Sequence, residues 1–198
     1  MSMTIAEYDR LVRMVADVFA TARQLFADDP KWQGKENAHF CAAERTTGRM
    51  YFPPTLIGEP MKDDPAKRIY VVQEKLGRLA RHPKHCSSRQ SRNPSALPWG
   101  EWGGAIALPF CPELELPSMG LTGLPELGDE AVLLEAAREF LKDLLFKRAE
   151  GGRPIKFLEN PGGSGLSLYL AHLYNIADYP DPEPNKYFYA LWEERRLM

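Results

Sequence analysis

The chain reads GGAIALPF at residues 103–110 and MGLTGLPELGDEAVLLEAA at residues 119–137, and these two segments indicate the fold more clearly than any other. Its apolar runs at 105–108 and 116–122 predict two short strands, because each is apolar and bounded by glycine or proline. Pro125 then stands at the first position of a long helix, where its missing N–H costs nothing. Two buried strands that lead into a helix predict the core of a mixed α and β protein.

The chain before this stretch predicts two helices and a hairpin. The first helix is expected over residues 4–28. Thr4 and Glu7 have the spacing of a capping box, with Thr4 as the N-cap. Tyr70 and Leu76 belong to the expected apolar face of the second helix. The expected elements are a hairpin with strands at 39–44 and 49–52 and a helix over residues 64–82.

The chain after Gly152 differs in composition from the part before it. A strand is expected at 155–158, a helix at 166–177, an extended Pro-rich link at 178–184 and a terminal helix with an aromatic face. We therefore expect an α+β domain over residues 1–150, with an antiparallel sheet of about five strands flanked by helices. Residues 151–198 are expected to form a C-terminal extension, a helical tail.

Composition narrows the function classes. The 198 residues are 44% hydrophobic and 26% charged, as in ordinary globular proteins. The formal net charge of −2 argues against a nucleic-acid partner, which usually binds a basic surface. No apolar run approaches the roughly 20 residues of a membrane span, and no signal peptide is evident. A cytoplasmic protein with no membrane partner and three free cysteines is expected.

Two glycine motifs carry a resemblance. Gly103-Gly104-Ala105-Ile106, together with Gly120-Leu121-Thr122-Gly123 and the later Asp129-Glu130-Ala131, resembles paired signatures of the GlcG/HbpS-like family of haem-binding and haem-degrading proteins. The helix that carries Lys75 is similar to the preceding helix of that family. The resemblance implies a profilin-like fold, a tendency to form oligomers, and haem or another tetrapyrrole as ligand. The long loop at 84–102 and the tail depart from the family pattern.

Two groups of candidate ligands lie in the loop after the second helix. His82 and His85, next to Cys86, could hold a metal or haem iron. The alternative is that His82 caps the end of the helix while His85 faces solvent. Arg89 and Arg92 suit a phosphate or a carboxylate. The alternative for them is an ordinary solvated loop.

Two further groups flank the central strands. Trp99 and Trp102 could stack on a flat ligand, although aromatic anchors of the loop are the commoner case. Thr122 precedes a helix N-terminus, a place that favours anions. The acidic residues that follow it would repel a bound phosphate, so a structural role of this turn is favoured over anion binding.

The pattern as a whole predicts a small-molecule binding protein, with haem or another tetrapyrrole as the ligand that the resemblance implies. The alternative is a protein–protein interaction or structural module without such a ligand. No nucleophile elbow, zinc motif or catalytic triad can be assigned, so the sequence leaves an enzymatic activity undecided. An exposed sheet edge and the aromatic tail helix predict a homodimer.

Overall fold

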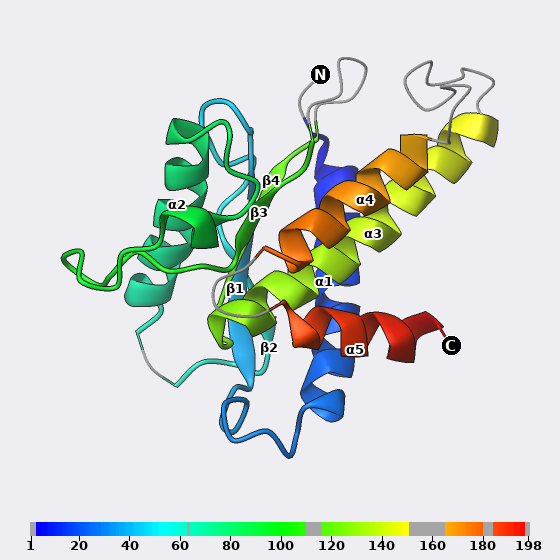
Figure 1. The fold of residues 1–198 in the computed structure, drawn as a ribbon. Helices are drawn as coiled ribbons and strands as arrows, with labels where there is room; N and C mark the ends of the chain where they lie inside the picture. Colours follow the sequence, from blue (N-terminus) through cyan, green and yellow to red (C-terminus); the bar gives the residue numbers. More distant parts are fainter. Residues whose placement is uncertain (1–2, 63, 110–115, 151–164, 180–183, 197–198) are drawn as a thin grey trace.

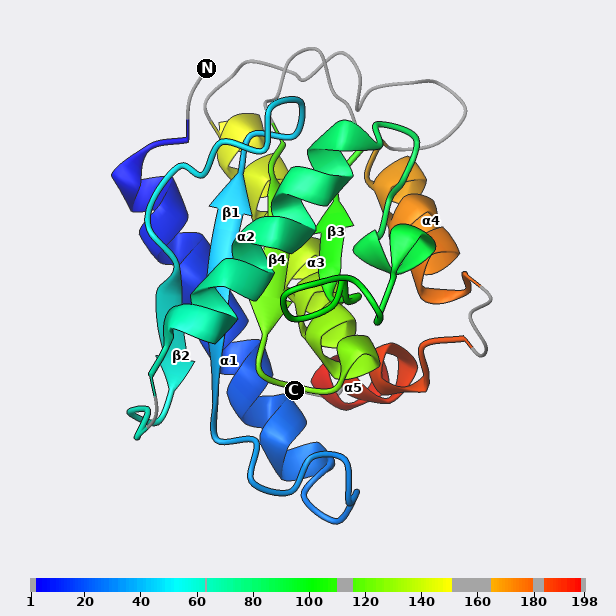
Figure 2. The same ribbon diagram turned by 90° about the vertical axis from the view of Figure 1, so that its left-hand side faces the viewer.

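The computed structural model describes residues 3–62, 64–109, 116–150, 165–179 and 184–196. Its centre is an antiparallel sheet of four strands in the order β2-β1-β4-β3 (Figures 1 and 2). The strands are β1 (Asn37–Ala43), β2 (Thr55–Gly58), β3 (Ala105–Ala107) and β4 (Ser118–Thr122). The predicted α+β class is confirmed.

Helices cover both faces of this sheet. Helix α2 lies on one face, and α1 and α3 lie on the other, with α4 and α5 packed against α3 (Figures 1 and 2). The helices are α1 (Ile5–Leu25), α2 (Ala66–Arg81), the 3-10 helix η1 (Ser88–Ser91), α3 (Glu126–Glu150), α4 (Gly165–Ala177) and α5 (Lys186–Arg196). None of the helices in the described part of the chain is both long enough and apolar enough to cross a membrane.

Helix α3 is the centre of the core. Every residue from Asp129 to Arg138 is buried, because the helix lies between the sheet on one side and α4 and α5 on the other. A helix surrounded in this way is mostly small or apolar around its circumference, and its buried charged side chains have partners of opposite charge. Leu141, on its expected buried stripe, is 3% exposed.

Two predictions about the elements are wrong. Residues 49–52 do not form the second strand, since Met50 makes a single bridge to Ala43 and the pairing partner of β1 is Thr55–Gly58. The apolar face of α2 is also displaced: Tyr70 is 39% exposed, whereas Lys75 and Arg78 are buried. Four strands are described where about five were expected, and the expected strand at 155–158 lies outside the described residues.

The tail packs on its own chain. Tyr187, Phe188 and Leu191 of α5 are buried in the same hydrophobic cluster as α1, the sheet and α3. The outer edge of β3 is also covered: the Ala107 N–H donates to the Cys86 carbonyl (2.8 Å), and His172 of α4 lies 3.1 Å from the Ala107 carbonyl. The β3 edge of the sheet therefore has partners within the chain.

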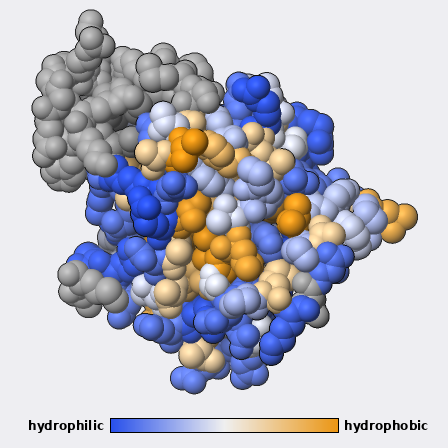
Figure 3. All heavy atoms as spheres, turned by 180° about the vertical axis from the view of Figure 1, so that it is seen from behind, coloured by the Kyte–Doolittle hydropathy of each residue, from blue (hydrophilic) through white to orange (hydrophobic). Residues whose placement is uncertain are grey.

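The loop between η1 and β3 projects from the body beside α2 (Figures 1 and 2). Leu97 lies in this loop and is 92% exposed. Seen from behind, the surface is mostly hydrophilic, with a hydrophobic patch near the centre and hydrophobic atoms at the tip of a projection (Figure 3).

Candidate functional site

The main candidate site is a cleft of about 480 Å³. It lies between the first half of α2, the loop before β3 and the start of α3. It is lined by Lys35, Lys67, Arg68, Val71, Lys75, Trp99, Trp102, Thr122, Gly123, Leu124, Pro125, Glu126 and Asp129. These residues are far apart in sequence, and the fold gathers them at one end of the sheet.

Three cations at this cleft have no carboxylate partner among the described residues: Lys35, Lys67 and Arg68. Lys35 precedes β1, and the other two lie in the first turn of α2. Arg68 Nη1 donates to the Asn37 carbonyl (3.0 Å) and to the side-chain oxygen of the same residue. The position of its guanidinium is thereby fixed, while its positive charge stays available to a ligand.

Trp99 and Trp102 supply an aromatic wall. They are 39% and 36% exposed, and Trp102 Nε1 donates to the Trp99 carbonyl (2.7 Å). The ring of Tyr70 contacts Trp99 edge-on at a centroid distance of 4.8 Å. The two indoles are therefore held in place and still accessible.

Arg78 fixes the loop that carries these tryptophans. Its guanidinium is buried and donates to the carbonyls of Ser88 (2.9 Å), Ser91 (2.6 Å) and Trp102. Glu74, one turn earlier on α2, pairs with the same guanidinium (2.9 Å). The sequence predicted an irregular loop here, and the structure shows a loop held to α2 by the hydrogen bonds of Arg78 as well as by the contact of Tyr70 with Trp99.

A buried ion pair forms the floor of the cleft. Lys75 Nζ lies 3.1 Å from Asp129 Oδ2 and donates to the Leu121 carbonyl (2.7 Å). The Leu124 N–H donates to Asp129 Oδ1 (3.0 Å). Burial raises the pKa of Asp129 to about 6, although the neighbouring Lys75 acts in the opposite direction. This pair holds α2, β4 and the start of α3 together.

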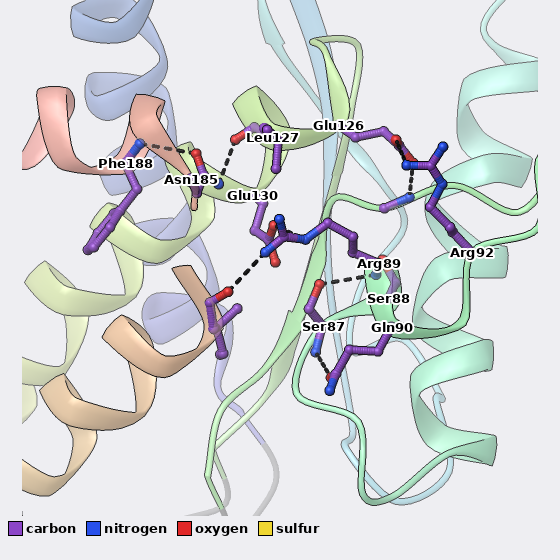
Figure 4. Close-up of polar contacts among 12 residues, drawn as sticks. Ser87, Ser88, Arg89, Gln90, Arg92, Glu126, Leu127, Glu130, Asn185 and Phe188 are labelled. Carbon is purple, nitrogen blue, oxygen red and sulfur yellow. Dashed lines mark hydrogen bonds and ion pairs between the residues drawn. The ribbon is translucent and has the colours of Figure 1, made fainter. Parts of the chain in front are cut away.

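The acidic residues at the start of α3 all have cationic partners. Glu126 pairs with Arg92 (3.4 Å) and accepts the Gly103 N–H, and Glu130 pairs with Arg89 (3.1 Å) (Figure 4). These cations offset the negative charge that follows Thr122, so the repulsion of an anion expected from the acidic residues is reduced at this turn.

The structure separates the predicted site residues into three groups. Trp99, Trp102 and Thr122 line the cleft. Arg89 is only 2% exposed, pairs with Glu130 and donates to the Ile176 carbonyl (3.0 Å), and Arg92 pairs with Glu126. These two arginines line a second, smaller cavity instead of the cleft.

His82 and His85 lie at the far end of α2. Their rings stack on each other at a centroid distance of 4.9 Å, and neither lines the cleft. At about 1.5 Å per residue, the helix places Arg68 and His82 roughly 20 Å apart. Burial, together with His82 and Arg78, lowers the pKa of His85. Within the described residues, no group of three or more His, Cys, Asp or Glu side chains could hold a metal ion.

The lining of the cleft also bears on haem. Haem iron is held by His, Cys, Met or Tyr side chains, and none of these occurs among the described lining residues. The cleft therefore does not fit coordination of haem iron, although a planar anion does not require such a ligand.

Sequence patterns alone did not identify Lys35, Lys67 and Arg68. One signal was present: Lys67-Arg68 stands in the first turn of a helix, where cations are unfavourable unless they serve another purpose. Lys35 lines the cleft because the fold brings the segment before β1 close to the start of α3. No local sequence pattern predicts this placement.

No family model, curated protein or solved structure matches the chain. The resemblance to the GlcG/HbpS-like family therefore rests on the short motifs alone.

Proposed function

We propose that the protein binds a small anionic molecule with a planar ring system in the cleft. One observation carries the proposal: three cations without carboxylate partners in the described structure and two accessible tryptophans meet in one cavity. Its volume of about 480 Å³ falls within the roughly 300–1,000 Å³ of ligand pockets.

The lining assigns a part of the ligand to each side chain. The indole faces of Trp99 and Trp102 suit stacking on a planar ring. Lys67 is exposed and Arg68 partly exposed, and both suit a carboxylate or phosphate, which Arg binds with two parallel hydrogen bonds. The Lys75–Asp129 pair is neutral overall, so it adds rigidity to the floor of the cleft without adding net charge.

A tetrapyrrole is a member of this ligand class, since it combines a flat ring with carboxylates. The family motifs support this choice because their residues converge on the cleft: Gly104 packs against the Lys75–Asp129 pair, and Thr122 lines the cavity. A profilin-like architecture belongs to the same proposal, and the antiparallel four-stranded sheet with helices on both faces supports it. Iron coordination is not part of it.

The test is a fluorescence titration of the protein with protoporphyrin IX and with 2-naphthoate, a smaller planar anion. The double variant Lys67→Ala/Arg68→Ala should weaken binding of at least one probe by about tenfold or more, since charge-assisted hydrogen bonds are lost. The matched control is Lys62→Ala, which removes an exposed cation that does not line the cleft. Equal affinity in all three proteins would contradict the proposal, as would no binding of either probe.

A role in protein–protein interaction is the second candidate, favoured by the exposed side chain of Leu97 beside the half-exposed Trp99. Exposed apolar clusters mark interaction sites, and a second copy of the chain is the partner we propose. Light scattering should then give twice the chain mass of 22.4 kDa, and Leu97→Ser should lower it. A single chain mass at high concentration would exclude the homodimer.

A further inference from the structure

A second cavity, of about 240 Å³, shares Pro125 and Glu126 with the cleft. Three cations line it: Lys31, Arg89 and Arg92. We infer that this cavity is a separate binding site for a small oxyanion, a carboxylate or a phosphate. The inference does not depend on a planar ligand in the cleft.

Arg89 is the central group of this site. It is 2% exposed, its Nε pairs with Glu130 Oε2 (3.1 Å) and its Nη2 donates to the Ile176 carbonyl (Figure 4). Its Nη1 is also buried and, like Nε, has no hydrogen-bond partner in the described part of the structure. Buried polar groups are nearly always hydrogen-bonded, so this cavity-lining guanidinium retains donor capacity for a ligand.

The charges of the lining favour an anion. Its one carboxylate is Glu126, which accepts the Gly103 N–H and pairs with Arg92. Glu130, behind Arg89, does not line the cavity. Arg92 is paired with Glu126 and Arg89 with Glu130, so Lys31 supplies the excess positive charge, and the start of the 25-residue helix α3 adds to the same potential.

The tail builds one wall of the site. Tyr187 of α5 lines the cavity, and its hydroxyl donates to Asp29 Oδ2 (2.7 Å). Asn185 is fully buried and donates to the Leu127 carbonyl (2.9 Å), which fixes α5 to the start of α3 (Figure 4). The C-terminal segment is therefore needed to form this wall of the cavity.

The size of the cavity limits the ligand. About 240 Å³ is smaller than the usual pocket for a drug-sized molecule. Arginine recognises carboxylate and phosphate with the same two-donor geometry. The side chains of Leu127 and Pro125 offer an apolar surface to a short alkyl chain. Propionate and inorganic phosphate are therefore the two probes that distinguish a carboxylate ligand from a phosphate ligand.

The experiment is calorimetric titration at constant ionic strength with sodium phosphate and, separately, sodium propionate. Replacing Arg89 would leave Glu130 buried and unpaired, so the test uses Lys31→Ala/Arg92→Ala, which changes side chains nearer the surface. Lys67→Ala is the control, because Lys67 lines the cleft and does not line this cavity.

We expect one of the two anions to bind with 1:1 stoichiometry. The double variant should weaken that binding by about tenfold or more, and Lys67→Ala should leave it within about twofold. The inference is overturned if neither anion shows saturable binding or if the double variant binds as well as the wild type. It is also overturned if Lys67→Ala abolishes binding, because the anion then occupies the cleft.

Discussion

Gly104 approaches Asp129 so closely that a Cβ atom on residue 104 would lie 2.6 Å from the Asp129 Cβ. The same atom would lie 2.8 Å from Lys75 Nζ, and Gly104 has a φ of +94°, which L side chains rarely adopt. The second glycine of the Gly103-Gly104 motif is therefore required by the buried ion pair beneath the cleft.

Gly104→Ala should lower the free energy of unfolding by about 2 kcal/mol or more, since it combines a left-handed backbone with a clash. Gly34→Ala is the control: Gly34 has a φ of +68°, but a Cβ added there would meet no atom within 4 Å apart from its chain neighbours. Denaturant unfolding should show a smaller loss for the control, about 1 kcal/mol. Equal losses would mean that the contact with Asp129 does not matter.

The Lys75–Asp129 pair should behave as one unit. Asp129→Leu alone should cost about 3–5 kcal/mol, because it leaves the ammonium group of Lys75 buried without its carboxylate. Adding Lys75→Met should recover part of this loss, since no buried charge then remains. A double-mutant cycle measures the coupling, and additive losses would contradict a direct interaction.

Stability should depend on pH through Glu130. Burial raises the pKa of Glu130 from 4.5 to about 7 in the folded protein, although Arg89 acts against the shift. The folded state then binds this proton more tightly than the unfolded state, so its contribution is complete below pH 4.5 and is lost as pH rises to about 7.

The matched variant for this prediction is Glu130→Gln, which cannot titrate. Between pH 4.5 and 7, the free energy of unfolding of the wild type should fall relative to that of the variant. Urea unfolding at several pH values measures the difference. A difference that is constant with pH, or that grows in favour of the wild type as pH rises, would contradict a raised pKa.

Arg78 should control the order of the tryptophan loop. Arg78→Met removes the donors to Ser88, Ser91 and Trp102, so amide hydrogens of residues 88–102 should exchange faster. Because the loop carries Trp99 and Trp102, binding of a planar anion in the cleft should weaken as well. Unchanged exchange in this loop would show that other contacts hold it.

The sequence predicted the elements whose signals are local. The capping box of Thr4 and Glu7 and the strand–strand–helix order around Gly120 are present in the structure. A strand was expected at 49–52 because aromatic residues such as Tyr51 and Phe52 are typical of strands. In the structure β1 pairs with Thr55–Gly58 instead. A choice between two neighbouring segments depends on long-range register, which local propensity does not contain.

The candidate site was predicted only in part. Trp99, Trp102 and Thr122 were identified because aromatic residues in a loop and a turn before a helix are local patterns. The burial of Lys75 could not be predicted, since its partner Asp129 lies 54 residues further along the chain. A lysine on a helix is usually solvated, and only the fold brings it to a carboxylate.

We propose that the cleft selects a planar molecule by its negative charge. The most direct measurement compares protoporphyrin IX with its dimethyl ester, which has the same ring and no carboxylates, by quenching of tryptophan fluorescence. We predict that the diacid binds at least about tenfold more tightly, and that Lys67→Ala/Arg68→Ala removes most of this preference. Equal affinity for the diacid and the ester, unchanged in the variant, would contradict an anion-binding cleft.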